Sequence, residues 1–139
     1  MNWWLRHADT AVAPSLLSAD FARLAEELVD MERAGADLFH LDVMDAHFVP
    51  NLTFGPFIVQ AIRRSTELVL DAHLMMTDPA DYLEPFAKAG ADALTIHVEA
   101  DSPVGETLAR IRELGMRPGL SLNPGTDLDA VRPFLPDLD

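Results

Sequence analysis

The sequence predicts an α/β fold built around one parallel sheet, and three observations lead to this prediction. Short apolar runs alternate along the chain with longer segments whose apolar residues recur at helical spacing. Successive apolar runs begin roughly 25 to 30 residues apart, as a strand with its crossover helix requires. Two joints, RAGAD at 33–37 and KAGAD at 88–92, end a helix on glycine before a strand begins. Together these features indicate consecutive βα units, which form parallel sheets with right-handed crossovers.

The first βα unit is predicted to begin with a strand at residues 11–18, AVAPSLLS. A helix follows this strand, with Asp20 as its N-cap and Gly35 at its end. One face of the helix carries the apolar residues Phe21, Leu24, Ala25, Leu28 and Met31. The second unit has its strand at residues 37–45 and, after a long loop, a shorter helix at 56–64.

Three more units follow in the same manner. The third strand is predicted at residues 68–76, and Asp78 and Pro79 open a helix that Pro85 should interrupt or kink. The fourth strand is predicted at 91–99. Ser102 and Pro103 open the next helix, which ends at Gly115. The fifth strand is predicted at 117–123, and a capping box at 126–129 precedes a last helix.

The two faces of each predicted strand differ in polarity. One face is wholly apolar, whereas the opposite face turns polar toward the C-terminal end of the strand. A doubly wound sheet buries both faces under helices, but a (β/α) barrel has an inward face whose chemistry lies at the C-terminal strand ends. His40, Asp42 and His73 fall on that face at those ends. The pattern therefore favours a barrel.

The composition excludes several classes of protein. The chain has 139 residues, of which 49% are hydrophobic, and this suits one domain with a buried core. Its formal charge of −13 argues against nucleic acid as a partner, since phosphate backbones bind basic surfaces. There is no cysteine, so disulfides and thiolate metal ligands are excluded. No apolar run reaches the roughly 18 residues that a membrane span needs. The N-terminus lacks the features of a secretory signal, so we expect a cytoplasmic location.

His-x-Asp on one strand and a histidine on the next predict a metal site. An unpaired carboxylate on a buried face costs several kcal/mol, so Asp42 needs partners. Two imidazoles, from His40 and His73, together with this carboxylate suit a borderline divalent metal such as zinc. Structural roles are the expectation for the other inward polar residues, Asp71, His97 and Glu99.

Five stretches of the chain carry a resemblance to a known family. In chain order they are APSLLSADFARL, FHLDVMDAHFVPNLTFGP, DAHLM, KAGAD and GLSLNPGT. In this order and spacing they closely resemble ribulose-phosphate 3-epimerase, from about Ala11 to the last residue, and HLDVMD followed by HFVPN is highly specific. The resemblance implies an α/β fold that is a partial (β/α)8 barrel of the ribulose-phosphate-binding type, with about five βα units present at residues 11–139.

The resemblance also implies an activity and its residues. The activity is a metal-dependent isomerisation that epimerises C3 of D-ribulose 5-phosphate to D-xylulose 5-phosphate through an enediolate. The implied cofactor is one divalent metal ion (zinc, iron, manganese or cobalt), and the partner is a small phosphorylated ketose. His40, Asp42 and His73 match three of the family's four metal ligands, and Asp42 matches one of its two acid–base groups. The residues implied to contact the substrate are Ser15, Met44, His73 and Met75.

Three features depart from the family pattern. Ala46 stands where the family usually has glycine, and a positive φ there costs an alanine around 1 kcal/mol or more. Residues 1–10 form an N-terminal extension without an assigned role. Five βα units fall short of a barrel's eight, so the second catalytic aspartate, the third methionine and the phosphate-binding loops are not among them. We therefore expect the N-terminal portion of an epimerase, a truncated product or a partial gene model, and an inactive isolated chain.

Two other interpretations stay open at the level of the sequence. One is a 3-epimerase for another phosphorylated ketose, such as a six-carbon one. The other is a non-catalytic half-barrel that acts by association. Open edges at the first and fifth predicted strands expose unpaired N–H and C=O groups, which favours a homo-oligomer or self-association.

Overall fold

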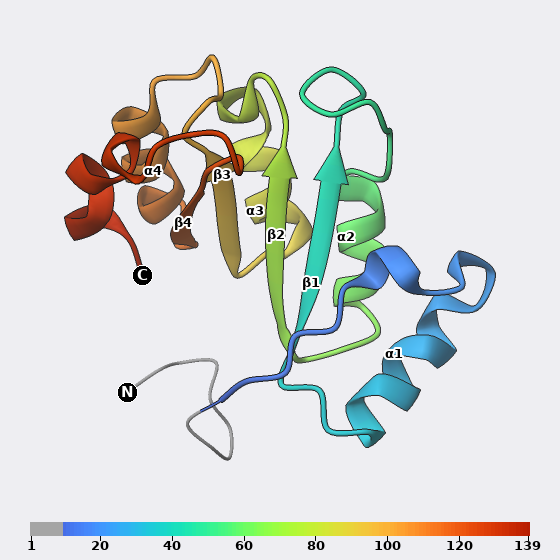
Figure 1. Cartoon of the computed structure of the whole chain (residues 1–139). Coiled ribbons are helices and arrows are strands. Elements are labelled where there is room, and N and C mark those ends of the chain that lie inside the picture. Colours follow the sequence, from blue (N-terminus) through green and yellow to red (C-terminus); the bar gives the residue numbers. More distant parts are fainter. Residues whose placement is uncertain (1–9) are drawn as a thin grey trace.

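A computed structural model describes residues 10–139, and a four-stranded parallel sheet with the order β1-β2-β3-β4 forms its centre. The strands are β1 (Leu38–Met44), β2 (Val69–Met75), β3 (Ala93–His97) and β4 (Arg117–Ser121). Three helices cover one face of this sheet: α2 (Pro56–Arg63), α3 (Leu83–Ala89) and α4 (Val104–Glu113) (Figure 1). The predicted alternation of parallel strands and helices, and with it the partial-barrel fold class, is confirmed. The extension predicted at residues 1–10 lies outside the described residues, apart from Thr10.

The remaining elements are one α-helix and several 3₁₀ helices. Asp20 accepts a hydrogen bond from the Ala22 N–H at 2.9 Å and so caps the first turn, as predicted. Gly35, with φ of 101°, follows the end of α1 and turns the chain toward β1. Within residues 10–139, no helix is long and apolar enough to cross a lipid bilayer. The elements are η1 (Leu16–Ser18), η2 (Phe21–Arg23), α1 (Leu24–Arg33), η3 (Pro79–Tyr82), η4 (Leu128–Ala130) and η5 (Arg132–Asp137).

The prediction of a regular first strand at residues 11–18 was wrong. Residues 11–14 do run beside β1, where the carbonyls of Val12 and Pro14 accept from Asp37 N–H (2.9 Å) and His40 N–H (3.0 Å). The donors that a ladder needs in return are absent, because Pro14 has no N–H and Val12 N–H bonds to the Asp37 carboxylate at 2.8 Å. Only an isolated bridge between Ser15 and His40 forms, and η1 follows it.

Three predicted helix starts also differ from the structure. Asp78 does not cap its helix; its carboxylate accepts from Ser102 Oγ at 2.8 Å, and Ser102 Oγ accepts from the Ala80 N–H at 3.3 Å. Ser102 therefore serves the unit before its own. Pro85 lies in the first turn of α3, where a proline is tolerated, and the turn before it is the 3₁₀ helix η3. The helix predicted after residues 126–129 consists of two short 3₁₀ helices, η4 and η5, and Asp127 caps η4 in place of the predicted box.

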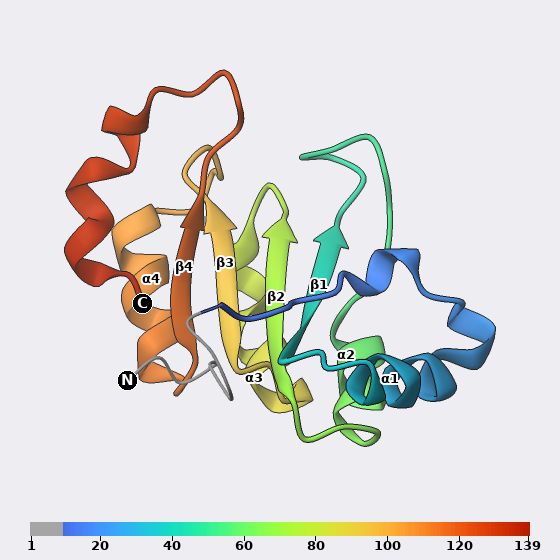
Figure 2. The ribbon, with the colours of Figure 1, turned by 60° about the horizontal axis from the view of Figure 1, so that its bottom comes forward.

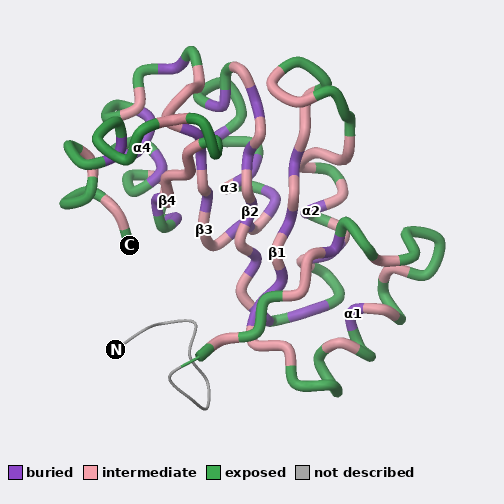
Figure 3. Tube along the Cα trace, viewed as in Figure 1, coloured by how far each residue is buried: buried purple, intermediate pink, exposed green. Residues whose placement is uncertain are grey.

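The two faces of the sheet differ as the alternation predicts. On the helix-covered face the strand residues are buried, and Figure 3 shows buried and half-buried positions alternating along the strands. These buried residues are Phe39, Leu41, Val43, Leu70, Ala72, Leu74, Leu94 and Ile96. The three helices leave the other face open, and residues 10–14 pass across it toward β1 (Figure 2). Polar side chains of β1 and β2 can therefore gather on the open face.

Candidate metal and acid–base site

The structure brings His40, Asp42 and His73 together on the inner face. The first two residues lie on β1, with one residue between them, and so project to the same side. β1 and β2 are parallel neighbours, and their register places Asp42 directly beside His73. All three side chains are largely withdrawn from solvent, with exposed fractions of 28%, 17% and 19% in chain order. Parallel pairing in this register thus converts a sequence spacing of thirty-odd residues into direct contact.

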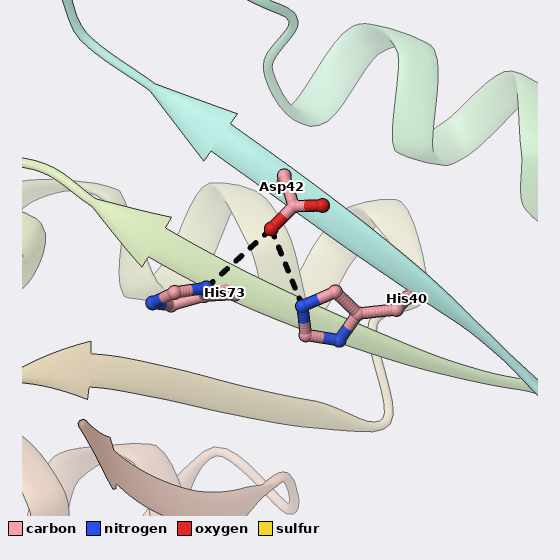
Figure 4. Close-up of side chains that lie close together, drawn as sticks. All are labelled: His40, Asp42 and His73. Carbon is pink, nitrogen blue, oxygen red and sulfur yellow. Dashed lines mark ion pairs between the residues drawn. The ribbon is translucent and has the colours of Figure 1, made fainter. Parts of the chain in front are cut away.

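The three side chains aim one ligand atom each at a common point (Figure 4). Asp42 Oδ1 lies 3.3 Å from His40 Nε2 and 3.5 Å from His73 Nδ1. All three ligand atoms lie within 4.8 Å of one another, so a single ion could touch them all. Two imidazole nitrogens and one carboxylate oxygen form a donor set that suits zinc and neighbouring transition metals. The residues present therefore fit the divalent ion that the sequence predicts.

A second carboxylate holds His40 from behind. Asp71, which is paired with His40 in the β1–β2 register, places Oδ2 2.8 Å from His40 Nδ1. This hydrogen bond is the largest of the effects that raise the pKa of His40, and burial opposes it. Because the carboxylate accepts the Nδ1 proton, the lone pair of neutral His40 is on Nε2, toward Asp42. Metal-binding histidines in general donate their outer N–H to such a partner.

Ser15 holds the other oxygen of Asp42. Its hydroxyl donates to Asp42 Oδ2 at 2.5 Å, while Oδ1 is left facing the two histidines. The resemblance implied a substrate contact for this serine, and the structure places it at the candidate acid–base carboxylate. The two implied substrate-lining methionines, Met44 and Met75, pair with each other at the C-terminal ends of β1 and β2, and both are half-buried.

His73 also contacts His97, to which the sequence assigned a structural role. Its Nε2 lies 2.8 Å from His97 Nε2, and the two rings stack with centroids 4.9 Å apart. His97 Nδ1 is in turn 3.2 Å from Glu99 Oε2. Burial is the largest cause that lowers the pKa of His73. The inward parity of His97 was a signal for this contact, but the register sets His73 beside Thr95, two residues earlier.

Comparison with known proteins assigns the chain to a family. Residues 11–139 match the Ribulose-phosphate 3 epimerase family. The chain is 52% identical over 128 residues to ribulose-phosphate 3-epimerase of Bacillus subtilis, with 92% of this chain and 59% of that protein covered. It is 55% identical over 130 residues to the protein of the same name from Synechocystis sp., with coverages of 92% and 56%. A cytoplasmic isoform from Oryza sativa subsp. japonica is 50% identical over 129 residues, with coverages of 92% and 57%.

The alignments cover only part of the length of each relative. The chain spans between half and two thirds of the length of each of these relatives. The matched part includes every residue of the candidate site, because Ser15, His40, Asp42 and His73 all lie within 11–139. The alignments with these relatives include 92% of this chain, and about one aligned residue in two is identical. On this match, the chain belongs to the ribulose-phosphate 3-epimerase family.

Proposed function

We propose that this chain acts in the epimerisation of D-ribulose 5-phosphate to D-xylulose 5-phosphate at C3, with Asp42 as an acid–base group and a divalent metal held by His40, Asp42 and His73. The observation that carries the proposal is the convergence of the three ligand atoms within 4.8 Å. Family membership supports the reaction class and a phosphorylated ketose as substrate. Zinc, iron, manganese and cobalt all suit the donor set.

The chemistry of the substrate explains why these residue types are needed. The proton on C3 is next to the C2 ketone, so its removal gives an enediolate whose charge is shared with the ketone oxygen. A bound divalent ion would supply Lewis-acid stabilisation of that negative charge. General acid–base catalysis by a positioned carboxylate contributes roughly 10² to 10⁴ in rate. Asp42 would accept the C3 proton from one side of the substrate.

The surroundings of Asp42 suit this role. Oδ1 faces the two histidines, so Oδ2 is the oxygen available for proton transfer, and the Ser15 hydroxyl fixes its position. The thioethers of Met44 and Met75 form an apolar border at the strand ends and offer no competing proton donor. Ser15, His73 and the two methionines are accordingly the proposed substrate-contacting residues.

Inversion at C3 needs a second group on the opposite side of the substrate. On the inner face, Asp71 accepts from His40, and Glu99 accepts from the backbone N–H of Asn123 and the hydroxyl of Thr126. Both carboxylates are therefore engaged by other partners: Asp71 lies on β2, the neighbour of the strand that carries Asp42, and Glu99 follows the end of β3. We propose that residues 10–139 supply one of the two proton-transfer groups. These residues alone should then exchange the C3 proton with solvent without inverting the centre.

Incubation of the chain with D-ribulose 5-phosphate and a divalent metal in heavy water tests the proposal. We expect deuterium to enter C3, and we expect Asp42→Asn to slow this exchange by 10²-fold or more, because the general base is lost. Asp30→Asn, on the exposed surface of α1, is the matched control and should leave exchange unchanged. Exchange that is equally fast in Asp42→Asn would remove Asp42 from the mechanism. D-xylulose 5-phosphate formed at an enzyme-like rate would show that the chain supplies both groups.

A further inference from the structure

A chain of contacts leads from His73 away from the candidate metal site to the loop after β4. His73 Nε2 meets His97 Nε2 at 2.8 Å, and His97 Nδ1 meets Glu99 Oε2 at 3.2 Å. The other oxygen of Glu99 accepts from the Asn123 N–H at 2.7 Å and from the Thr126 hydroxyl. The contacts thus join β2, the end of β3 and the NPGT loop (residues 123–126) in one line.

The direction of each hydrogen bond in this line is determined by the carboxylate. Glu99 in its ionised form can only accept, so the proton between it and neutral His97 is on His97 Nδ1. The lone pair of His97 is then on Nε2, and it must accept from His73 Nε2–H. His73 consequently keeps the lone pair on Nδ1, the atom that faces Asp42 Oδ1. Only this order of protons makes every bond in the line.

We propose that His97 and Glu99 are positioning residues that fix the tautomer and orientation of His73, so that Nδ1 is available to a metal. This inference rests on the proposed function, since it gives the tautomer its purpose. The arrangement parallels the opposite side of the site, where Asp71 accepts from His40 Nδ1 and leaves Nε2 free. One histidine is thus held by a carboxylate directly and the other through an intervening imidazole.

The environment of His97 supports a positioning role. Its exposed fraction is 6%, and it lies between two rings, with Phe48 at 4.7 Å and His73 at 4.9 Å between centroids. A polar ring that is buried this deeply needs both nitrogens satisfied, and its two partners satisfy them. Phe48 belongs to the HFVPN motif and Thr126 to the NPGT motif. Packing and hydrogen bonding from both motifs therefore converge on one line of side chains.

Glu99→Gln is a sharp test because it reverses the donor and acceptor roles along the line from residue 99 to His73, while the side chain keeps nearly the same shape. The amide oxygen must take the place facing Asn123 N–H and the Thr126 hydroxyl, since both are donors. The amide NH₂ then faces His97 Nδ1, which has to accept. His97 becomes the donor through Nε2, and His73 is left with its proton on Nδ1. Glu84→Gln, on the exposed surface of α3, is the matched control.

The readout is the tautomer of His73 in the ¹⁵N-labelled full chain without metal, from the nitrogen shifts of its ring at mildly alkaline pH. We expect the proton on Nε2 in the wild type and in Glu84→Gln, and on Nδ1 in Glu99→Gln. A wild-type His73 with its proton on Nδ1, or an unchanged tautomer in folded Glu99→Gln, would overturn the inference. The wild-type spectrum decides by itself if the variant does not fold.

Metal affinity gives an independent readout and separates this inference from the proposed function. Competition between the chain and a chelator for Zn²⁺ should show affinity reduced by about 10- to 100-fold in Glu99→Gln, as is usual for partners of metal ligands. Unchanged affinity would contradict the inference. A tautomer that switches as expected in a chain that binds no Zn²⁺ at all would support the positioning role and overturn the proposed metal site.

Discussion

At the scale of single residues, Ala46 carries backbone strain in the loop that follows β1. Its φ is 64°, in the left-handed region that an alanine adopts only with strain, and among the described residues it is the one non-glycine with positive φ. We predict that Ala46→Gly raises the free energy of unfolding by about 1 kcal/mol. Ala87→Gly in α3 is the matched control and should lower it by a similar amount.

Urea titration of the two variants measures these changes. A destabilised Ala46→Gly would mean that the loop gains more from the restricted alanine than it loses in strain.

Asp45 anchors the same loop and predicts an acid dependence of stability. Burial opposes its ionisation, but the backbone N–H groups of Thr77, His47 and Phe48, each at 2.8 Å, lower its pKa from 3.8 to about 2. Because the folded-state pKa is the lower one, the stabilisation is complete above 3.8 and is lost as the pH falls toward 2.

We therefore predict that Asp45→Asn costs roughly 1 kcal/mol at neutral pH and flattens the fall in stability across this acidic range. Denaturant titrations at several pH values measure both effects, with Asp81→Asn on η3 as the control. An acid profile identical to that of the wild type would assign the acid sensitivity to other carboxylates.

The residues of the site differ in how far the sequence could predict them. His40, Asp42 and His73 could be predicted, because strand parity and position at the strand end depend only on spacing. His97 and Glu99 could not, because the contact of His97 with His73 is set by the β2–β3 register, and the position of Glu99 by the loop after β4. Register depends on tertiary packing, so it cannot be inferred from a single sequence.

At the scale of elements, the two repeated joints perform the same task. The aspartate that closes each joint accepts from a backbone N–H at the start of the preceding unit: Asp37 from Val12 and Asp92 from Leu70, both at 2.8 Å. The glycine of each joint has positive φ, at 101° for Gly35 and 94° for Gly90. The sequence repeat thus reflects one hydrogen-bonding solution that is used at two αβ connections.

The two glycines differ in their surroundings, which makes them a matched pair. A Cβ on Gly90 would come 2.6 Å from Cγ of Arg63, whose guanidinium is held by Asp92 and by the Leu68 carbonyl. A Cβ on Gly35 would meet nothing within 4 Å. We predict that Gly35→Ala costs about 1 kcal/mol from backbone strain, and that Gly90→Ala costs a further 1–3 kcal/mol from overpacking.

Thermal or denaturant unfolding of both variants measures the difference. Equal losses would show that Arg63 moves aside at no cost and that only backbone strain matters.

The first predicted strand shows the limit of sequence patterns at this scale. Its apolar residues are typical of a strand, and it does lie beside β1. Pro14 lacks the N–H that pairing needs, and the Asp37 carboxylate takes the N–H of Val12. The proline was visible in the sequence, whereas the competing carboxylate became apparent only when the joint was folded.

At the scale of the whole molecule, the open face and the edge of the sheet predict self-association. Among the described strands, β4 pairs only with β3, and Asp139 N–H bonds to its outer side at the Pro118 carbonyl (3.2 Å). A cavity of about 300 Å³ lies on the inner face, lined in part by Ala13, Asp71 and Thr95. Uncovered edges and faces of this kind recruit other chains. The charge of −13 opposes this association, and salt screens the repulsion.

We predict that the 139-residue chain associates reversibly and that added salt strengthens the association. Sedimentation velocity at several concentrations and two ionic strengths measures this. A compact monomer under all of these conditions would show that the open face is stable in water.

A titration of the chain with Zn²⁺ or Mn²⁺ tests whether His40, Asp42 and His73 form one metal site. We predict one ion per chain, bound with modest affinity because three protein ligands hold it. Affinity should fall at least tenfold in His73→Ala, while His47→Ala, at an exposed histidine of the loop after β1, should leave it unchanged. Stoichiometric binding that His73→Ala does not weaken would place the metal elsewhere and refute a site at these three residues.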